Sequence, residues 1–362
     1  MTPGENLAVD IVVNNYNYGR FLAEAIESAL GQTHERVRTI VVDDGSSDGS
    51  RELLRDYEDR VTVVLKENGG QASALNLGME RSEGDVVIFL DADDTLDPEA
   101  AARVAAVFAA EEAVAKVQFR TAVIDAEGEP TGAIKPAAHL PMPSGDLRGD
   151  ELAFPYDLVW MATSANAFRA EALRRILPIP EQDFRLCADW YLVHLTALLG
   201  EVISLDEICG AYRLHGANSY EPQGSDLDIA HLRATIGFAA ATSPRLLRLA
   251  GDLGLARPER ILSLADLANR MISLRLAPDL HPIESDRAAA LVLDAARATR
   301  RRSNVSAAMK ALFVIWFGAM AIAPRPLARR LATLFLFPQS RSSLNRVLGR
   351  FQRSGGRAVP AA

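Results

Sequence analysis

The sequence predicts an α/β fold with a largely parallel sheet, and three observations lead to this prediction. Short, bulky apolar runs alternate with helical patterns over residues 8–125, as in a chain of strand–helix–strand units. Two of these runs, 39–42 and 86–90, lead into turns that are rich in aspartate. The chain has 362 residues, of which 49% are hydrophobic and 24% are charged, so it can bury one large core and a second, smaller one.

The expected elements follow this alternation along the chain. We expect strands near 9–13, 37–43, 61–66, 85–90 and 115–124 and helices near 19–31, 48–58, 71–81 and 97–111. The last of these helices opens with Asp97-Pro98-Glu99, in which proline suits the first helical turn and the acids suit the helix dipole. The second aspartate-rich turn is therefore predicted to lead straight into a helix.

Glycines and prolines are dense over residues 125–150, which predicts a hairpin followed by a loop over the site. A mixed section should follow and complete the sheet. It comprises a strand near 159–168, helices near 170–176 and 186–199, and strands near 201–205 and 208–214. From about residue 227 onward the pattern is helical, and no repeat is evident.

The aspartate-rich turns, 42–46 and 90–94, come at the carboxyl ends of their strands. In open α/β sheets this edge is where ligands bind. Carboxylates that are crowded together repel one another unless a hard cation or hydrogen-bond donors compensate them, and a nucleoside diphosphate needs such a cation too. The two turns therefore predict a nucleotide-sugar site with a divalent metal.

Six segments of residues 9–94 together carry a family resemblance. They are 9–22 (VDIVVNNYNYGRFL), 32–33 (QT), 41–48 (VVDDGSSD), 68–71 (NGGQ), 76–78 (NLG) and 89–94 (FLDADD). In this order and spacing the chain resembles the family 2 inverting glycosyltransferases of the GT-A fold. The resemblance implies a Rossmann-like mixed sheet flanked by helices, with weaker similarity to about residue 220 and a helical extension beyond it.

The resemblance also implies an activity. The enzyme would move one sugar from a nucleoside diphosphate donor of the UDP or GDP type to an acceptor hydroxyl, with Mg or Mn and with inversion at the anomeric carbon. The acceptor would be a carbohydrate or a lipid-linked glycan in cell-envelope polysaccharide assembly. Nucleic acid is not an expected partner.

The resemblance places donor contacts at the ends of the strands and on the turn that contains Gly69 and Gly70. The predicted donor-binding residues are Asn14, Tyr16, Asp43, Asp44, Gly70, Gln71, Asn76, Asp91 and Arg213. A carboxylate can accept a hydrogen bond from a base or a ribose hydroxyl, and glycines let the backbone approach a ligand. Alternatively, Asp43 and Asp44 form only a turn into the next helix, and Gly70 belongs to a simple tight turn.

Asp91 and Asp93 are the predicted metal ligands, because alternate residues of an extended segment face the same side. The metal would stabilise the departing nucleoside diphosphate. His215 would complete the metal shell, although a lone histidine is more often structural. Asp94 should face elsewhere and cap the helix at 97.

The candidate catalytic base is Asp189. In the family the base lies in a pair of acids that opens a helix about a hundred residues after an Asp-x-Asp (DxD) motif, which is Asp91-Ala92-Asp93 in this chain. Here Ala188 replaces the first acid of the pair. A carboxylate in this place can accept the hydroxyl proton as the new bond forms. Alternatively, Asp189 serves only the helix dipole. Trp190 is either a sugar platform or a core residue.

The first residues, 1–6, are neither basic nor apolar, and the two cysteines, Cys187 and Cys209, do not have a metal-binding spacing. Both observations lead us to expect a cytoplasmic protein.

Charge is distributed unevenly. Residues 295–362 contain 13 lysines and arginines and no acid, so the net charge of −8 divides into −21 before residue 295 and +13 after it. The apolar runs 311–323 and 331–337 lie among these arginines and are too short to span a bilayer. They are either interfacial helices on the inner face of the plasma membrane, with Trp316, Phe317, Phe335 and Phe337 inserted, or helices buried on the catalytic domain or in a dimer.

The expected domains are a catalytic domain over 1–222, a helical extension over 223–302, basic apolar helices over 303–353 and a disordered tail over 354–362. Two other functions stay open. The first is transfer to a polyprenyl phosphate, whose oxyanion would not need Asp189. The second is a non-catalytic nucleotide-sugar-binding subunit, for which Ala188 is the supporting feature.

Overall fold

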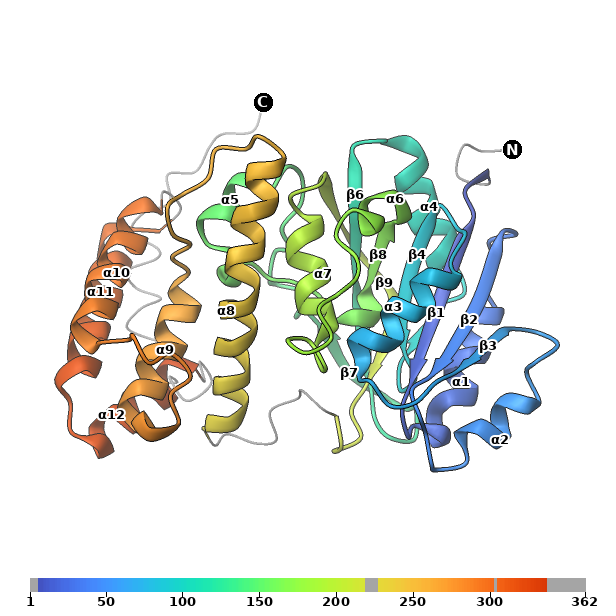
Figure 1. Ribbon diagram of the computed structural model, residues 1–362, viewed down its shortest axis with the longest axis horizontal. Coiled ribbons are helices and arrows are strands. Elements are labelled where there is room, and N and C mark those ends of the chain that lie inside the picture. Colours follow the sequence, from blue (N-terminus) through green and yellow to red (C-terminus); the bar gives the residue numbers. More distant parts are fainter. Residues whose placement is uncertain (1–5, 219–226, 303–304, 337–362) are drawn as a thin grey trace. The chain divides into compact units, whose positions relative to one another are not determined.

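The computed structural model describes residues 6–218, 227–302 and 305–336, which belong to two compact units (Figure 1). The first unit comprises residues 1–221 and 237–263, and the second comprises residues 222–236 and 264–362. This division differs from the predicted one. Residues 237–263 cluster with the first unit, and the helices before and after residue 302 cluster together.

Nine strands of the described chain form one mixed sheet in the first unit, in the order β3-β2-β1-β4-β8-β6-β9-β5, with β7 beside β6. Four strands are parallel: β3 (Thr62–Leu65), β2 (Val37–Asp43), β1 (Val9–Asn15) and β4 (Val86–Asp91). β8 (Asn166–Arg169) is antiparallel to both of its neighbours, and β6 (Val114–Ile124) is parallel to β9 (Glu201–Arg213). The five strands that were predicted before residue 125 are thus confirmed.

Helices cover both faces of the parallel half of the sheet. Alternate strand residues such as Ile11 and Ile88 form one core with buried residues of α1 (Gly19–Leu30) and α4 (Ala100–Ala110). On the opposite face Gly78 of α3 (Gln71–Arg81) lies so close to Val12 that an added Cβ would be 2.3 Å from the Val12 Cγ1. The glycine therefore sets how closely α3 packs on the sheet.

Strand register brings the polar ends of three strands together. Asn14 pairs with Asp91 across β1 and β4, and Asn15 pairs with Asp43 across β1 and β2. The edge that the sequence predicted as the ligand edge therefore carries these polar side chains side by side.

Several elements differ from the prediction. Helix α2 is short (Ser50–Arg55), and the two-residue strand β5 (Thr95–Leu96) separates the DxD turn from α4. The hairpin is present as β7 (Pro130–Lys135) paired with β6, but it is followed by helix α5 (Arg148–Ala153). The expected strand at 159–168 is short. The 3-10 turn Thr163–Ala165 interrupts it, and β8 begins only after that turn.

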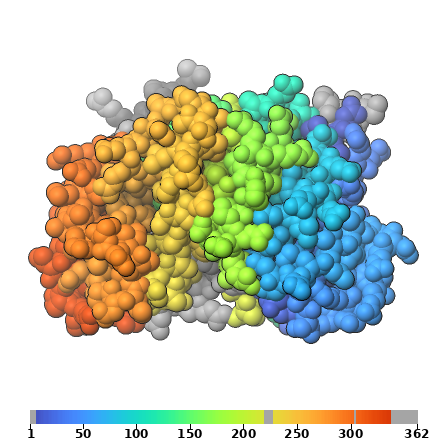
Figure 2. All heavy atoms as spheres, viewed as in Figure 1, coloured from blue at the N-terminus to red at the C-terminus, as the bar shows by residue number. Residues whose placement is uncertain are grey.

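The remaining predicted elements of the first unit are present, but their bounds differ from the prediction. α6 (Ala170–Arg174) and α7 (Ala188–Thr196) are shorter than expected, and the two predicted final strands form one strand, β9, with a register shift between Phe119 and Arg120 of its partner. On the face shown in Figure 2 the side chains of α7 lie next to those of α3, and the two helices are in contact.

The second unit is helical, as predicted. α8 (Ile229–Asp252) contributes its first turns, and α9 (Leu264–Leu276), α10 (Ala288–Arg301), α11 (Ala307–Ile322) and α12 (Arg325–Leu336) pack on one another. Met271, Leu291, Phe317 and Met320 are buried in this unit. Within the described ranges no helix has both the length and the apolar character that crossing a bilayer requires. Phe337 and the predicted disordered tail lie outside the described residues.

Candidate active site

A cavity of about 420 Å³ lies at the carboxyl ends of β1, β2 and β4. Eight of the predicted site residues line it: Asn14, Tyr16, Asp44, Gly70, Gln71, Asp91, Asp93 and Asp189. The other four, Asp43, Asn76, Arg213 and His215, are not among its lining residues. We call this cavity the donor cleft.

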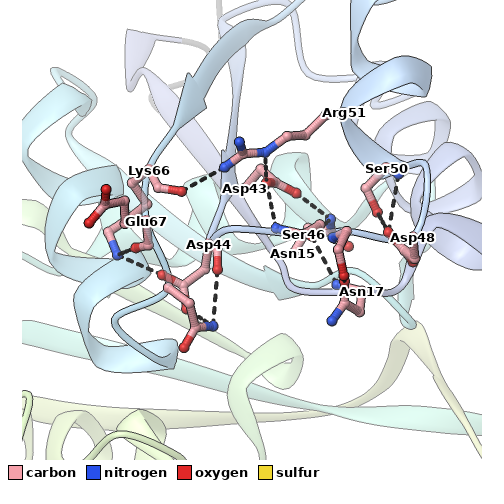
Figure 3. A network of polar contacts seen from close by, with 12 residues as sticks. Asn15, Asn17, Asp43, Asp44, Ser46, Asp48, Ser50, Arg51, Lys66 and Glu67 are labelled. Carbon is pink, nitrogen blue, oxygen red and sulfur yellow. Dashed lines mark hydrogen bonds and ion pairs between the residues drawn. The ribbon is translucent and has the colours of Figure 1, made fainter.

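Asp44 shapes one wall of the donor cleft by holding the glycine turn. Its carboxylate accepts hydrogen bonds from the backbone N–H groups of Gly69 (2.8 Å) and Gly70 (2.7 Å). The Lys66 ammonium donates a further hydrogen bond to it (2.6 Å) (Figure 3). Gly70 has φ +93°, and an added Cβ would be 2.4 Å from the Cγ of Arg185. Position 70 therefore requires glycine for conformation and for space.

Asp43 is not among the lining residues of the cleft, and its contact with the donor stays a prediction. Its side chain is fully buried and accepts hydrogen bonds from Asn15 (2.8 Å), the Ser46 N–H (3.0 Å) and Arg51 (2.9 Å) (Figure 3). Burial alone would raise the pKa of Asp43, but the hydrogen bonds from Ser46, Arg51 and Asn15 outweigh it and lower the pKa. Asp43 thus fixes the turn that carries Asp44.

Asn76 also lies outside the cleft. Its side-chain amide exchanges two hydrogen bonds with the backbone of Ile179, at 2.8 and 2.9 Å, so it fastens α3 to the segment before α7. These bonds are structural, and the contact of Asn76 with the donor stays a prediction. The local sequence gives no sign of the contact with Ile179, because the two residues are about a hundred positions apart in the chain.

Asp91 ends β4 and is held by two amide side chains. The Nδ2 of Asn14 (2.8 Å) and the Nε2 of Gln71 (2.9 Å) both donate to its Oδ1. Burial, together with the nearby carboxylates of Asp93 and Asp189, raises the pKa of Asp91 to about 7, although the hydrogen bonds from Asn14 and Gln71 oppose this shift.

Asp93 lies two residues beyond Asp91, and its Oδ2 is 2.9 Å from the Nε2 of His215. The imidazole of His215 is itself packed against Tyr18 and Phe21, with ring centroids 5.4 and 5.0 Å away. Because both rings fix the imidazole, Asp93 and His215 form a preformed pair at the rim of the donor cleft.

Arg213 holds the turn that carries Asp93 and Asp94 and is not among the lining residues of the cleft, so its contact with the donor stays a prediction. Its Nε donates to the backbone oxygen of Asp93 (2.9 Å), its backbone N–H donates to Asp94 Oδ1 (3.0 Å), and its Nη2 pairs with Glu24 (2.6 Å). Asp94 does line the cleft, whereas we expected it to cap a helix. Burial and the Asp93 and Asp91 charges hold the pKa of Asp94 well above its ordinary value.

Asp189 lies in the first turn of α7. The helix begins at Ala188, directly after Cys187, which has φ +56°. Burial raises the pKa of Asp189, and the hydrogen bond from the Trp190 N–H (2.9 Å) opposes that shift only in part. The start of α7 is also linked to Asp91. The Ala188 N–H donates to the Oε1 of Gln71 (2.9 Å), and the Nε2 of the same side chain donates to Asp91.

A second cavity, of about 440 Å³, adjoins the first. Four aromatic side chains line it: Tyr156, Trp160, Trp190 and Tyr212. Asp94 and Asp189 line both cavities, so they lie where the two meet. We call the second one the aromatic cavity. Sequence reasoning singled out only Trp190 among its rings, and no local motif marks the others.

Three titratable side chains, Lys116, Glu151 and His194, are buried next to the aromatic cavity. The Nζ of Lys116 lies 4.1 Å from the centre of the Trp160 ring, and His194 lies 2.7 Å from Glu151. Desolvation lowers the pKa of Lys116 and raises that of Glu151.

The three predicted metal ligands are not gathered into one shell. Among the residues that the structure describes, no three histidine, cysteine or acidic side chains are placed to hold one metal ion. Asp93 and His215 are adjacent, whereas the Oδ1 of Asp91 is taken up by Asn14 and Gln71.

Comparison with known proteins relates residues 10–177 to the model of "Glycosyl transferase family 2". An uncharacterized glycosyltransferase of Nostoc sp. is 34% identical over 218 residues, which are 59% of this chain and 67% of the relative. The "Putative teichuronic acid biosynthesis glycosyltransferase TuaG" of Bacillus subtilis is 41% identical over 90 residues, 24% of this chain and 36% of the relative.

Among solved structures, TarS residues 1–349 of S. aureus in complex with UDP-GlcNAc aligns over 91% of both chains with a TM-score of 0.53 and 14% identity. At this identity the likeness concerns the fold.

Proposed function

The chain belongs to glycosyl transferase family 2 and has a GT-A fold with a helical C-terminal region, and from this premise we propose that it is an inverting glycosyltransferase. It transfers a sugar from a nucleoside diphosphate donor to an acceptor hydroxyl. The observation that carries this proposal is the position of Asp189, which lines both the donor cleft and the aromatic cavity. A base there can face donor and acceptor together.

The donor part of the proposal rests on the shape of the donor cleft. Asn14, Tyr16 and the Gly70 turn line a cavity large enough for part of a nucleotide sugar, and the turn opens α3, whose N-terminus favours negative charge. The proposed donor is of the UDP or GDP type. Asp44 would act on the donor mainly by holding the turn that faces it.

A divalent cation is the second part of the proposal. Asp91, Asp93, Asp94 and Asp189 all line the donor cleft, and the pKa values of three of them (Asp91, Asp94 and Asp189) are raised by burial or by the other carboxylates. Oxygen ligands with uncompensated charge suit Mg or Mn. Asp93 and the adjacent His215 would hold the ion together with Asp91, whose Oδ1 accepts hydrogen bonds from Asn14 and Gln71 in this structure. The ion would supply Lewis-acid stabilisation of the leaving diphosphate.

Asp189 is the proposed base. Its raised pKa makes it a stronger proton acceptor than an ordinary carboxylate, which suits removal of a hydroxyl proton as that oxygen attacks the anomeric carbon. Attack from the aromatic cavity, on the side opposite the diphosphate, would invert the configuration. Gln71 contributes by fixing the start of α7 on the DxD turn.

The aromatic cavity is the proposed acceptor site. Its four aromatic rings offer flat apolar faces against which a sugar ring can stack, as aromatic side chains commonly do in ligand sites. Asp189 at its junction with the donor cleft can accept the proton of an acceptor hydroxyl. This position favours a hydroxyl acceptor over the alternative, a polyprenyl phosphate, whose oxyanion needs no base.

Cell-envelope glycan assembly is the proposed setting, because the B. subtilis relative is named for teichuronic acid biosynthesis. Two free cysteines are consistent with the proposed cytoplasmic location. We further propose that the protein works at the inner face of an anionic membrane. A non-catalytic, nucleotide-sugar-binding role remains a second candidate, since Ala188 stands where the family has an acid.

The test is turnover with a panel of UDP- and GDP-sugars, with Mn²⁺ and with a chelator, in the wild type and in Asp189→Asn. The amide keeps the shape of the side chain but cannot accept the proton. We expect donor affinity close to that of the wild type and transfer lowered by roughly 10²–10⁴-fold. No turnover of any donor by the wild type would favour the non-catalytic role, and full transfer by the variant would place the base elsewhere.

A further inference from the structure

Exposed apolar side chains are concentrated on α11 and α12 of the second unit. Five of the exposed large hydrophobic residues in the described ranges lie on or between these two helices: Leu312, Ile315, Ile322, Leu327 and Leu334. All the rest of the described chain has eight. A soluble surface rarely groups such residues without a binding partner.

On α11 these residues form one stripe. Leu312, Ile315 and Ile322 are 38%, 66% and 85% exposed, and spacings of three and seven residues place them on the same side of the helix. The other side of α11 is apolar too, because Phe317 and Met320 are fully buried. The helix therefore has an inner apolar face that packs within its unit and an outer apolar face that does not.

On α12 the exposed apolar residues are mixed with cations. Leu327, Arg330 and Leu334 follow one another at spacings of three and four and are all exposed, as are Arg325 and Arg329. Residues 295–362 contain no acid, so these charges are not offset by any carboxylate of the same stretch. The partner of this surface should be both apolar and anionic.

The aromatic residues that the sequence suggested for insertion serve another purpose. The Trp316 N–H donates to the backbone oxygen of Leu331 (3.1 Å), and its ring stacks on Phe335 with centroids 4.4 Å apart. Phe317 is fully buried. These rings hold α11 to α12, and the aliphatic residues form the outer surface instead.

We propose that the outer face of α11 and α12 binds an anionic lipid surface. The helices would lie in the membrane interface, with Leu312, Ile315 and Ile322 entering the apolar layer and the α12 arginines at the level of the lipid phosphates. A second copy of the chain fits less well, because a two-fold contact over this face would bring its arginines close to their own symmetry mates. The inference gives the proposed glycosyltransferase a membrane partner and stands whether or not transfer is detected.

The experiment is flotation of the full chain with vesicles of phosphatidylcholine alone or with added phosphatidylglycerol, at low and at high salt. We expect the protein to float with the anionic vesicles at low salt and to be released by added salt, since screening weakens attraction to charged lipid. Flotation equal on both vesicle types would overturn the electrostatic part of the proposal.

Two variants separate the apolar and the charged contributions. Ile315→Glu puts a charge into the apolar stripe and should weaken vesicle binding at least tenfold. The double variant Arg329→Glu, Arg330→Glu removes two cations, each of which contributes a factor of about five near an anionic surface, so we expect about 25-fold weaker binding or more.

Matched controls come from exposed residues elsewhere. Leu280→Glu changes a 54% exposed leucine outside the stripe, and Arg174→Glu with Arg175→Glu reverses two adjacent exposed arginines at the end of α6. Both should float like the wild type, and circular dichroism should show all variants folded. Equal loss in the controls would show that overall charge or hydrophobicity, and not this face, governs binding. A wild type that never floats but sediments as a dimer, with Ile315→Glu monomeric, would make the face a contact between copies.

Discussion

The Nε2 of Gln71 donates to the Oδ1 of Asp91 at 2.9 Å, while the Oε1 of the same side chain accepts from the Ala188 N–H at 2.9 Å. One amide therefore joins the DxD turn at the end of β4 to the first turn of α7. Asp189, the proposed base, lies one residue after Ala188. The spacing between the carboxylates of the donor cleft and the base depends on this bridge.

Replacing Gln71 should therefore slow transfer more than it weakens donor binding. Gln71→Leu removes a hydrogen bond to a charged group and frees the start of α7, so we expect transfer to fall by about 10–100-fold, with a smaller change in donor KM. Gln32→Leu is the matched control, because Gln32 also bridges two segments, through Asp97 and Ala101, but outside both cavities. Equal losses in the two variants would point to general destabilisation.

Asp93→Ala should abolish metal-dependent donor binding and turnover while the fold persists, because Asp93 projects from a preformed turn that Arg213 holds through the backbone. Calorimetric titration with Mn²⁺ checks this directly. Asp97→Asn, in the same connection but outside the cleft, should bind Mn²⁺ like the wild type. Unchanged metal affinity in Asp93→Ala would remove the residue from the proposed metal shell.

Asp43 should matter for stability and not for donor recognition. Its folded-state pKa is lowered, so the ionised form stabilises the fold at neutral pH, and this contribution is lost as the pH falls through the folded-state pKa. Asp43→Asn should lower the free energy of unfolding by about 2–3 kcal/mol at pH 7, measured by urea unfolding. The difference in stability between the variant and the wild type should disappear as the pH falls below about 4.

The exposed acid Asp59 provides the control for this measurement. Asp59→Asn should change stability little at any pH. If Asp43→Asn keeps full stability at pH 7 but loses donor affinity, the result would support the predicted contact of Asp43 with the donor.

The sequence predicted the parallel half of the fold well, because buried strands and amphipathic helices leave a local signal there. β2 and α3 begin and end where expected, and the family resemblance over residues 9–94 is confirmed. Elements without a strong local pattern were missed, such as the two-residue β5, which exists only because it pairs with β9.

The candidate site, like the fold, could be predicted only where the local sequence carries a signal. Acidic motifs predicted which strand ends meet, but the local sequence could not say which of two adjacent acids faces the cleft. Asp43 ends β2 and Asp44 follows it, and only contacts with Arg51 and with the Gly69–Gly70 turn distinguish their roles. Likewise, Trp160 and Tyr212 come to the aromatic cavity from segments about fifty residues apart, so no short motif marks it.

Trp160 offers the sharpest test of the proposed acceptor site. If sugar rings stack on its face, Trp160→Ala should raise the KM for a saccharide acceptor by roughly tenfold and leave donor hydrolysis unchanged, since the residue lines the aromatic cavity and not the donor cleft. Trp160→Phe is the matched variant, because the buried indole N–H has no hydrogen-bond partner in the described structure and its removal breaks no bond. Phenylalanine should therefore restore most of the acceptor affinity, and a mass-spectrometric assay of the product should show a glycoside and not a glycosyl phosphate. Equal donor hydrolysis and equal acceptor KM in all three proteins would exclude the aromatic cavity as the acceptor site.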